Sequence, residues 1–163
     1  ERDGVIGMAT DGSRLFSVGD ELSIDVWARN GTLLQSITMG MSAEPTALAW
    51  DPLTGSLLIT LGEDGLARLE MSSGSVDIWN DNDDFQQGHA FDVVARNGIA
   101  FVAIEGEGIA RVDLVNEEIL GSWRSSGVDD AAQAPIAVSG DRVYLGLYDA
   151  GVLYVFCYVC CVQ

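Results

Sequence analysis

The sequence is short of the residues on which much enzyme chemistry depends. Its 163 residues include no lysine and a single histidine, His89. The absence of lysine excludes Schiff-base catalysis and a lysine clamp for phosphate. No nucleophile-elbow motif accompanies the histidine, so no serine–histidine–aspartate triad is indicated, and we expect His89 to be exposed in its polar loop. The sequence therefore favours a protein that binds over one that catalyses.

Cysteine is also scarce, and its placement is informative. All three cysteines lie in the final stretch CYVCCVQ (157–163), so no cysteine elsewhere can bridge loops and the chain is not a disulfide scaffold. Cys157 and Cys160 form a lone C-x-x-C, which without a second pair or a nearby histidine is a weak metal signal, and we expect thiols that are buried or lie in the tail. The chain also lacks any run of about 18 apolar residues, which excludes a membrane-spanning helix.

Positive charge is the third thing the sequence has little of. There are 25 Asp and Glu residues against 8 arginines, giving a formal net charge of −17. Such a surface repels nucleic acid and anionic membranes, so we expect no nucleic-acid partner and no membrane insertion. It attracts cations or a basic protein partner. The composition fits a soluble protein, and the acidic surplus fits an extracytoplasmic location or a saline environment.

What the sequence does contain is a repeat. Residues 62–70 read GEDGLARLE and residues 105–113 read EGEGIARVD, with matching Gly, Ala and Arg 43 positions apart. Shifting the whole chain by this step aligns RLFSVG (14–19), LLITLG (57–62), AFVAIE (100–105) and VYLGLY (143–148). One column of this alignment holds Leu15, Leu58, Phe101 and Tyr144. A fixed period of this length is typical of repeat architectures.

Each repeat predicts four short strands joined by tight turns. One turn column holds Gly12, Gly55, Gly98 and Asp141, and a second holds Gly31, Gly74 and Glu117. Glycine supplies the positive φ that tight hairpins need. The aligned segments are rich in β-branched and aromatic residues, and no window keeps a helical apolar period. A four-stranded antiparallel unit repeated at this spacing is typical of a β-propeller blade, whereas a β-sandwich has no reason to repeat its columns.

The predicted fold is therefore all-β: a β-propeller portion with four blades of four antiparallel strands and a 43-residue repeat. We expect a single propeller-type domain over residues 1–163, with blades at about 4–40, 45–80, 88–124 and 134–163. The chain resembles the broad group of WD-repeat-like, YVTN-type and quinoprotein-like propellers. The segments GEDGLARLEMSSGSVDIW and EGEGIARVDLVNEEILGSW carry this resemblance. It is generic, assigns no subfamily and transfers no functional residues.

The fourth blade departs from the pattern. In its last segment, CYVCCVQ, no Gly, Asn, Asp or Pro stands where the other repeats turn, so we expect this blade to be incomplete. Three arrangements follow: a portion of a larger propeller, two copies in one ring of eight blades, or four blades that close alone. Exposed blade faces and unpaired strand edges recruit another chain, so we favour a homodimer.

The acidic residues concentrate in the loops of one face. In a propeller, the loops between second and third strands and those between blades lie on the same side. The binding candidates in these loops are Glu63, Asp64, Glu105, Glu107 and Asp149. The candidate ligands for Ca²⁺ or another hard cation are Asp81, Asp83 and Asp84 in DNDDFQQGHAFD (81–92). That loop matches an EF-hand poorly because Gln86 stands where glycine is required.

Three interpretations of this acidic face are open. It presents a site for a basic partner or scaffold contact, which is the function we predict. Alternatively, a cation near the ring axis assists a hydrolase or lyase of the propeller type. Finally, hairpin turns favour Asp, Asn and Gly for backbone reasons alone. The alignment also places Asp25 in the column of Arg68, which predicts an ion pair between adjacent blades worth about 0–1 kcal/mol.

Overall fold

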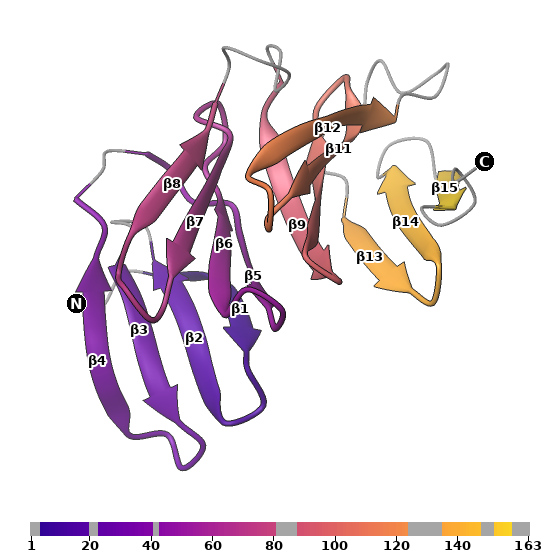
Figure 1. Cartoon of the computed structure of the whole chain (residues 1–163). Coiled ribbons are helices and arrows are strands. Elements are labelled where there is room, and N and C mark those ends of the chain that lie inside the picture. Colours follow the sequence, from indigo (N-terminus) through magenta and orange to yellow (C-terminus); the bar gives the residue numbers. More distant parts are fainter. Residues whose placement is uncertain are drawn as a thin grey trace.

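A computed structural model of the chain describes residues 4–19, 23–40, 43–80, 88–123, 135–147 and 152–157. These residues form four antiparallel sheets, numbered here as blades 1 to 4 in chain order (Figure 1). The strands are, in blade 1, β1 (Val5–Thr10), β2 (Arg14–Gly19), β3 (Ser23–Ala28) and β4 (Leu33–Thr38); in blade 2, β5 (Ala47–Asp51), β6 (Ser56–Thr60), β7 (Leu66–Glu70) and β8 (Val76–Trp79); in blade 3, β9 (Ala90–Arg96), β10 (Ile99–Ile104), β11 (Gly108–Asp113) and β12 (Glu118–Trp123); and in blade 4, β13 (Ile136–Ser139), β14 (Arg142–Leu147) and β15 (Val152–Cys157).

The predicted fold class is confirmed. Within each sheet the strands follow chain order, as hairpin after hairpin, and every described strand belongs to one of the four blades. Blades 1 to 3 have four strands, while the described part of blade 4 has three, as its missing turn residues predicted. The described residues contain no helix long and apolar enough to span a membrane. Cys157 is disulfide-bonded, so the expectation of a thiol is wrong for this residue.

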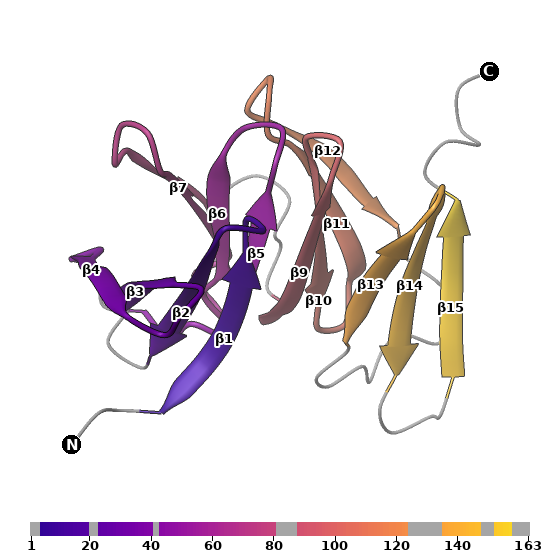
Figure 2. The same cartoon turned by 90° about the horizontal axis from the view of Figure 1, so that it is seen from below.

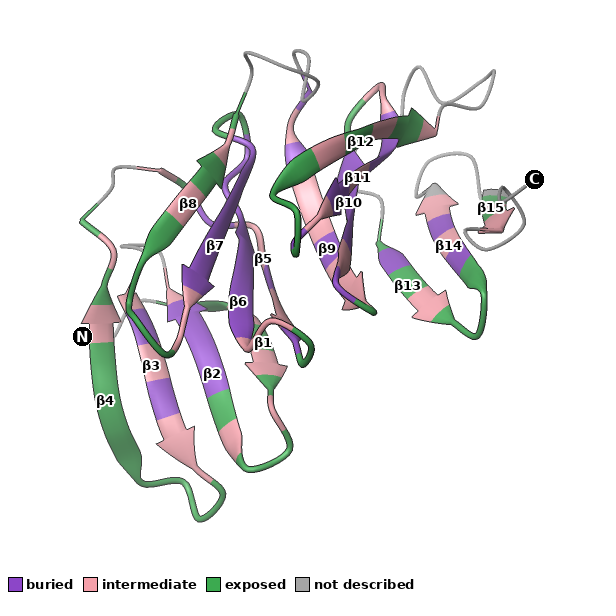
Figure 3. Ribbon diagram, viewed as in Figure 1, coloured by how far each residue is buried: buried purple, intermediate pink, exposed green. Residues whose placement is uncertain are grey.

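The four blades follow one another in an arc (Figure 2). The first strand of each blade lies on the inside of the arc, and β5 contacts both β1 and β9, which in turn contacts β13. Figure 2 shows β1 and β13 on opposite sides of the open part of this arc. The second and third strands of the middle blades are largely buried. Among the outermost strands, β8 and β12 alternate between exposed and half-buried residues, and β4 is exposed along most of its length (Figure 3).

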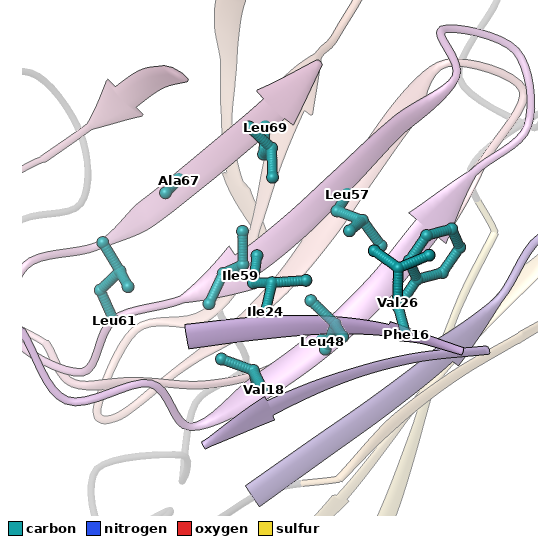
Figure 4. Close-up of a cluster of buried hydrophobic side chains, with 10 residues drawn as sticks. All are labelled: Phe16, Val18, Ile24, Val26, Leu48, Leu57, Ile59, Leu61, Ala67 and Leu69. Carbon is teal, nitrogen blue, oxygen red and sulfur yellow. The ribbon is translucent and has the colours of Figure 1, made fainter. Parts of the chain in front are cut away.

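Apolar side chains fill the space between blades. Phe16 of blade 1 is fully buried, and its ring stacks on that of Trp50 in blade 2 with centroids 5.4 Å apart. The buried cluster at this junction is drawn in Figure 4 and consists of Phe16, Val18, Ile24, Val26, Leu48, Leu57, Ile59, Leu61, Ala67 and Leu69. Burying each such side chain contributes about 1.5–3 kcal/mol relative to leaving it in water. Packing between blades therefore dominates the stability of the arc.

The strand register of blade 1 differs from the predicted alignment by one residue. Phe16 pairs with Val26 across the β2–β3 hairpin, as Leu58 pairs with Arg68 and Phe101 with Arg111. Phe16 therefore takes the position that the alignment gave to Leu15, whose side chain is 40% exposed. The β1–β2 connection from Asp11 to Arg14 is shorter than the β5–β6 connection from Asp51 to Ser56, so aligning the turns misaligns the strands. Because side chains alternate along a strand, this shift exchanges the two faces of the blade.

The predicted ion pair between Asp25 and Arg68 is wrong for the same reason. Asp25 faces away from blade 2 and accepts a hydrogen bond from the Ser36 hydroxyl. Arg68 points the other way, into blade 3, and is 7% exposed. Its Nη1 donates to the Leu114 carbonyl at 2.6 Å, and its Nη2 donates to Glu117 and to Asp77 of its own blade. Burial alone would lower the pKa of Arg68, but the hydrogen bonds and charges of the two carboxylates raise it.

Candidate functional site

The candidate site lies at one end of the blades. The inner strands β5, β9 and β13 all begin at this end, which we call the mouth end. β6 ends opposite the first residue of β5, because Thr60 pairs with Ala47, and β10 ends opposite the start of β9, because Ile104 pairs with Ala90. The loops after β6 and β10 therefore belong to the mouth end. The hairpin turns between first and second strands lie at the other end, here the opposite end.

Backbone hydrogen bonds fix the two acidic loops to the start of β9. In the loop after β6, the Leu61 amide donates to the Gly65 carbonyl, and the Ala90 amide donates to the Gly62 carbonyl, each at 2.9 Å. In the loop after β10, the Glu105 amide donates to the His89 carbonyl at 3.0 Å. Neighbouring blades thus hold residues 61–65 and 105–107 beside the segment that begins β9.

Gly65 shows why the repeated sequence is required here. It has φ of +84°, and a Cβ atom at this position would lie 2.2 Å from the Trp79 carbonyl oxygen. A side chain would be both strained and in collision with backbone. Gly108, its counterpart in the other repeat segment, has φ of +88°. Backbone conformation therefore accounts for the glycines, and it leaves the neighbouring acids unexplained.

Four of the five predicted binding residues lie at the mouth end, on adjacent blades. Glu63, Asp64 and Glu105 are exposed, and Glu107 is half-buried. The fifth, Asp149, and the metal candidates Asp81, Asp83 and Asp84 lie outside the described residues. Among the residues that are described, no group of three or more His, Cys, Asp or Glu side chains could hold a metal ion.

Carboxylates lie at both ends of the blades, whereas arginines are distributed unequally between them. The described carboxylates in the mouth-end loops are Glu44, Glu63, Asp64, Glu105 and Glu107. The described arginines are Arg14, Arg29, Arg96 and Arg142, in or beside turns of the opposite end, and Arg68 and Arg111, within strands between blades. Over the described ranges the mouth end therefore carries no arginine, and the whole chain has no lysine. A cation approaching the mouth end meets an electrostatic field of one sign.

A pocket of about 620 Å³ opens among the inner strands at the mouth end. Its lining includes Gly7 of β1, Ala47 of β5, Asp92 of β9 and Pro135 just before β13. Cross-strand pairing shows that these four residues hold the same position in their blades. Ile6, Met8 and Phe91 add apolar surface. This pocket could not be predicted from the sequence, because the equivalence of these positions depends on the hairpin registers.

Asp92 is the charged side chain of the pocket, and it joins blade 3 to blade 4. Its Oδ2 accepts a hydrogen bond from the Ile136 amide and its Oδ1 accepts one from the Val93 amide, both at 2.9 Å. Burial raises the pKa of the Asp92 carboxyl, and the two amides oppose this rise without cancelling it. Asp92 thus links blade 3 to blade 4 through these hydrogen bonds and also lines the pocket.

Asp92→Asn is expected to change how stability depends on pH. Because its folded pKa lies above the ordinary value of 3.8, the folded chain binds more protons than the unfolded chain as pH rises from 3.8 through the folded pKa. Stability contributed by Asp92 therefore falls as pH rises through this window. We expect the wild-type free energy of unfolding, relative to that of the variant, to increase on acidification. Urea unfolding of both proteins across this range measures it, and a difference that is constant with pH contradicts the assignment.

His89 is not simply exposed, contrary to the expectation from its polar loop. The residue is half-buried, its ring stacks on that of Phe91 with centroids 4.6 Å apart, and a Cβ on Gly62 would lie 2.9 Å from its Nε2. Within the described part of the chain, its buried Nδ1 has no hydrogen-bond partner. His89 therefore forms part of the pocket wall, directly behind the two acidic loops.

Solved structures share this fold at low sequence identity. The computationally designed Ika4 protein matches with a TM-score of 0.75 and 15% identity, over 96% of this chain and 92% of Ika4. The designed Ika8 protein gives 0.74 and 15%, and apo AztD from Citrobacter koseri gives 0.72 and 14%. Both matches cover 96% of this chain but only 46% and 45% of the other, so this chain spans less than half of their length. No protein-family model and no curated protein matches the sequence.

Proposed function

We propose that this chain is a non-enzymatic binding module whose mouth end takes up a basic segment of a partner protein. The observation that supports the proposal is that the described mouth-end loops carry carboxylates and no arginine. The mouth-end loops of blades 2 and 3 expose Glu63, Asp64 and Glu105, while the described arginines lie elsewhere. Complementary charge of this kind speeds encounter and selects the partner more than it adds affinity.

The pocket supplies the second part of the recognition. It lies directly beside the acidic loops, because its wall residue His89 is hydrogen-bonded through its backbone to Glu105. Met8 and Phe91 give it apolar surface, and Met8 is 63% exposed. A segment that combines arginine or lysine with an apolar side chain matches this arrangement. The cations face the loop carboxylates while the apolar group enters the pocket.

Removing the loop charges is expected to weaken binding of such a segment. As probe we choose an arginine-rich peptide with one tryptophan, titrated by calorimetry at low ionic strength. The variant Glu63→Gln/Asp64→Asn/Glu105→Gln should bind about tenfold more weakly, since each exposed charge contributes up to about 0.5 kcal/mol and tenfold corresponds to about 1.4 kcal/mol. Raising the salt concentration should weaken wild-type binding more than binding by the variant.

A matched variant separates this site from net charge. Glu70→Gln/Glu118→Gln/Asp141→Asn removes the same formal charge from the opposite end and should leave affinity within about twofold of wild type. Equal weakening by both triple variants would mean that the peptide responds only to the overall charge of −17. If millimolar Ca²⁺ raises the melting temperature beyond a control of matched ionic strength, the cation interpretation of the acidic loops replaces this one.

A further inference from the structure

The end blades of the arc each present a partly apolar face that no described residue covers. On blade 1, cross-strand pairing places Leu15 beside Trp27, and Trp27 beside Leu33, on the side away from blade 2. On blade 4, it places Tyr144 beside Val155 on the side away from blade 3. We call these the blade 1 face and the blade 4 face. Exposed members are Met8 (63%), Leu15 (40%) and Leu33 (38%) on blade 1, and Leu153 (61%) and Val155 (50%) on blade 4.

The interior of the chain shows what such faces pack against. The position of Tyr144 is occupied in the other blades by Phe16, Leu58 and Phe101, which are all 0% exposed and face the next blade. The position of Leu15 is occupied in the other blades by Leu57, Ala100 and Val143, also 0% exposed, which face the preceding blade. The two end faces are therefore the two complementary halves of a blade junction.

The blade 1 face and the blade 4 face of one copy cannot pack on each other. Blades 1 and 4 stand at opposite sides of the open part of the arc in Figure 2. In the Ika8 and AztD structures, the fold of this chain corresponds to less than half of a longer chain, so the same arrangement of blades occurs as a part of something larger. Exposed apolar patches on a sheet face of this kind mark sites of protein–protein interaction.

We propose that a second copy of this chain covers both faces and completes a ring of eight blades. The blade 4 face of each copy packs on the blade 1 face of the other, with a two-fold axis along the ring axis. On the blade 1 face, the Asp25 carboxylate accepts a hydrogen bond from the Ser36 hydroxyl. The pocket at the mouth end, lined in one copy by β1, β5, β9 and Pro135, then becomes half of a channel mouth that both copies enclose. This inference does not depend on the proposed binding function.

Light scattering coupled to gel filtration tests the proposal. The wild-type chain should have the mass of two copies, twice 17.4 kDa. Val155→Asp places a carboxylate in the middle of the blade 4 face and should return the mass to 17.4 kDa with an unchanged far-ultraviolet circular dichroism spectrum. Leu53→Asp, at a leucine that is 62% exposed in a turn of blade 2, should remain a dimer. A wild-type chain that stays single at tens of micromolar overturns the proposal.

A second variant tests the same junction if Val155→Asp fails to fold. Leu15→Asp damages the blade 1 face, on the other side of the same junction and away from the pocket, and should also give single copies. Mixing the two variants restores one intact junction, between the unaltered blade 4 face of Leu15→Asp and the unaltered blade 1 face of Val155→Asp. The mixture should therefore contain dimers. If it does not, the two end faces do not pack on each other and the ring is excluded. Peptide binding by the single copies reports separately on the proposed function.

Discussion

Phe16→Ala is expected to lower the free energy of unfolding by about 3–5 kcal/mol, the usual cost of removing a buried aromatic ring. The side chain is 0% exposed, stacks on Trp50 and lies in the middle of the junction between blades 1 and 2. Truncation leaves a cavity between two sheets, which relax toward each other only in part. Urea unfolding followed by tryptophan fluorescence measures the change.

The neighbouring residue is the matched control. Leu15→Ala should cost less than about 1 kcal/mol, because Leu15 lies on the outer face of blade 1 and is 40% exposed. Both variants are compared in the Val155→Asp background, so that no second copy covers Leu15. The alignment of repeats assigned the buried column to Leu15. A larger loss for Leu15→Ala than for Phe16→Ala would restore that alignment and reject the register described for blade 1.

Arg68→Ala is expected to cost about 2–3 kcal/mol, mostly through the loss of one buried hydrogen bond and of the packing of the arginine stem. Arg68 donates to the Leu114 carbonyl in the interior and lies 5.4 Å from the Trp79 ring centre. Its ion pairs contribute little of this, because the side chains of Asp77 and Glu117 are 43% and 60% exposed and return to water in the variant. Chemical denaturation of wild type and variant checks the value.

Two further substitutions separate the buried contact from the charges. Glu117→Gln removes one ion pair of Arg68 and should cost less than about 1 kcal/mol. Arg14→Ala removes a pair with Asp11 in an exposed turn, where the arginine side chain is 39% exposed, and should be similarly mild. If Glu117→Gln proves as costly as Arg68→Ala, the ion pair rather than the Leu114 carbonyl holds blades 2 and 3 together.

Much of the fold was predictable because turns that require a positive φ favour particular residues, above all glycine. The turn columns recur with positive φ in the structure: Gly12, Gly55 and Gly98 in one, and Gly31, Gly74 and Glu117 in the other. Even the non-glycine member, Glu117, has φ of +61°. In the fourth blade the prediction chose Asp141 for this turn, whereas Gly140, with φ of +61°, takes the role. Turns were thus located to within one residue.

The face of the blade to which each side chain points was less predictable, because it depends on whether the preceding turn has one residue more or fewer than its counterparts. A turn that differs in length by one or two residues leaves both hairpins intact but can change which side chains point to a given neighbour. Blade 1 shows this, since Phe16 and Leu58 are equivalent at a spacing of 42 whereas Gly12 and Gly55 are 43 apart. The interpretation of Asp25 and Arg68 failed at this step.

The candidate site also has one part that the sequence predicted and one part that it did not. The acids at Glu63, Asp64 and Glu105 could be found from sequence, because they follow strands that repeat and stand beside turn glycines. The pocket could not, since Gly7, Ala47, Asp92 and Pro135 share no residue type and become equivalent only through pairing within their blades. The absence of described arginines from the mouth end likewise depends on where the fold places arginines that are far apart in the chain.

The most direct test of the account is to locate a basic peptide on the protein. In a nitrogen-edited NMR titration of the labelled chain with the arginine-rich peptide, we expect the largest amide shifts in residues 61–65, 88–92 and 105–107, around the acidic loops and the pocket. The amides of the opposite-end turns at 11–13, 97–98 and 140–141 should stay in place. Shifts centred on those turns, or spread evenly over the four blades, would contradict the claim that the mouth end is the functional surface.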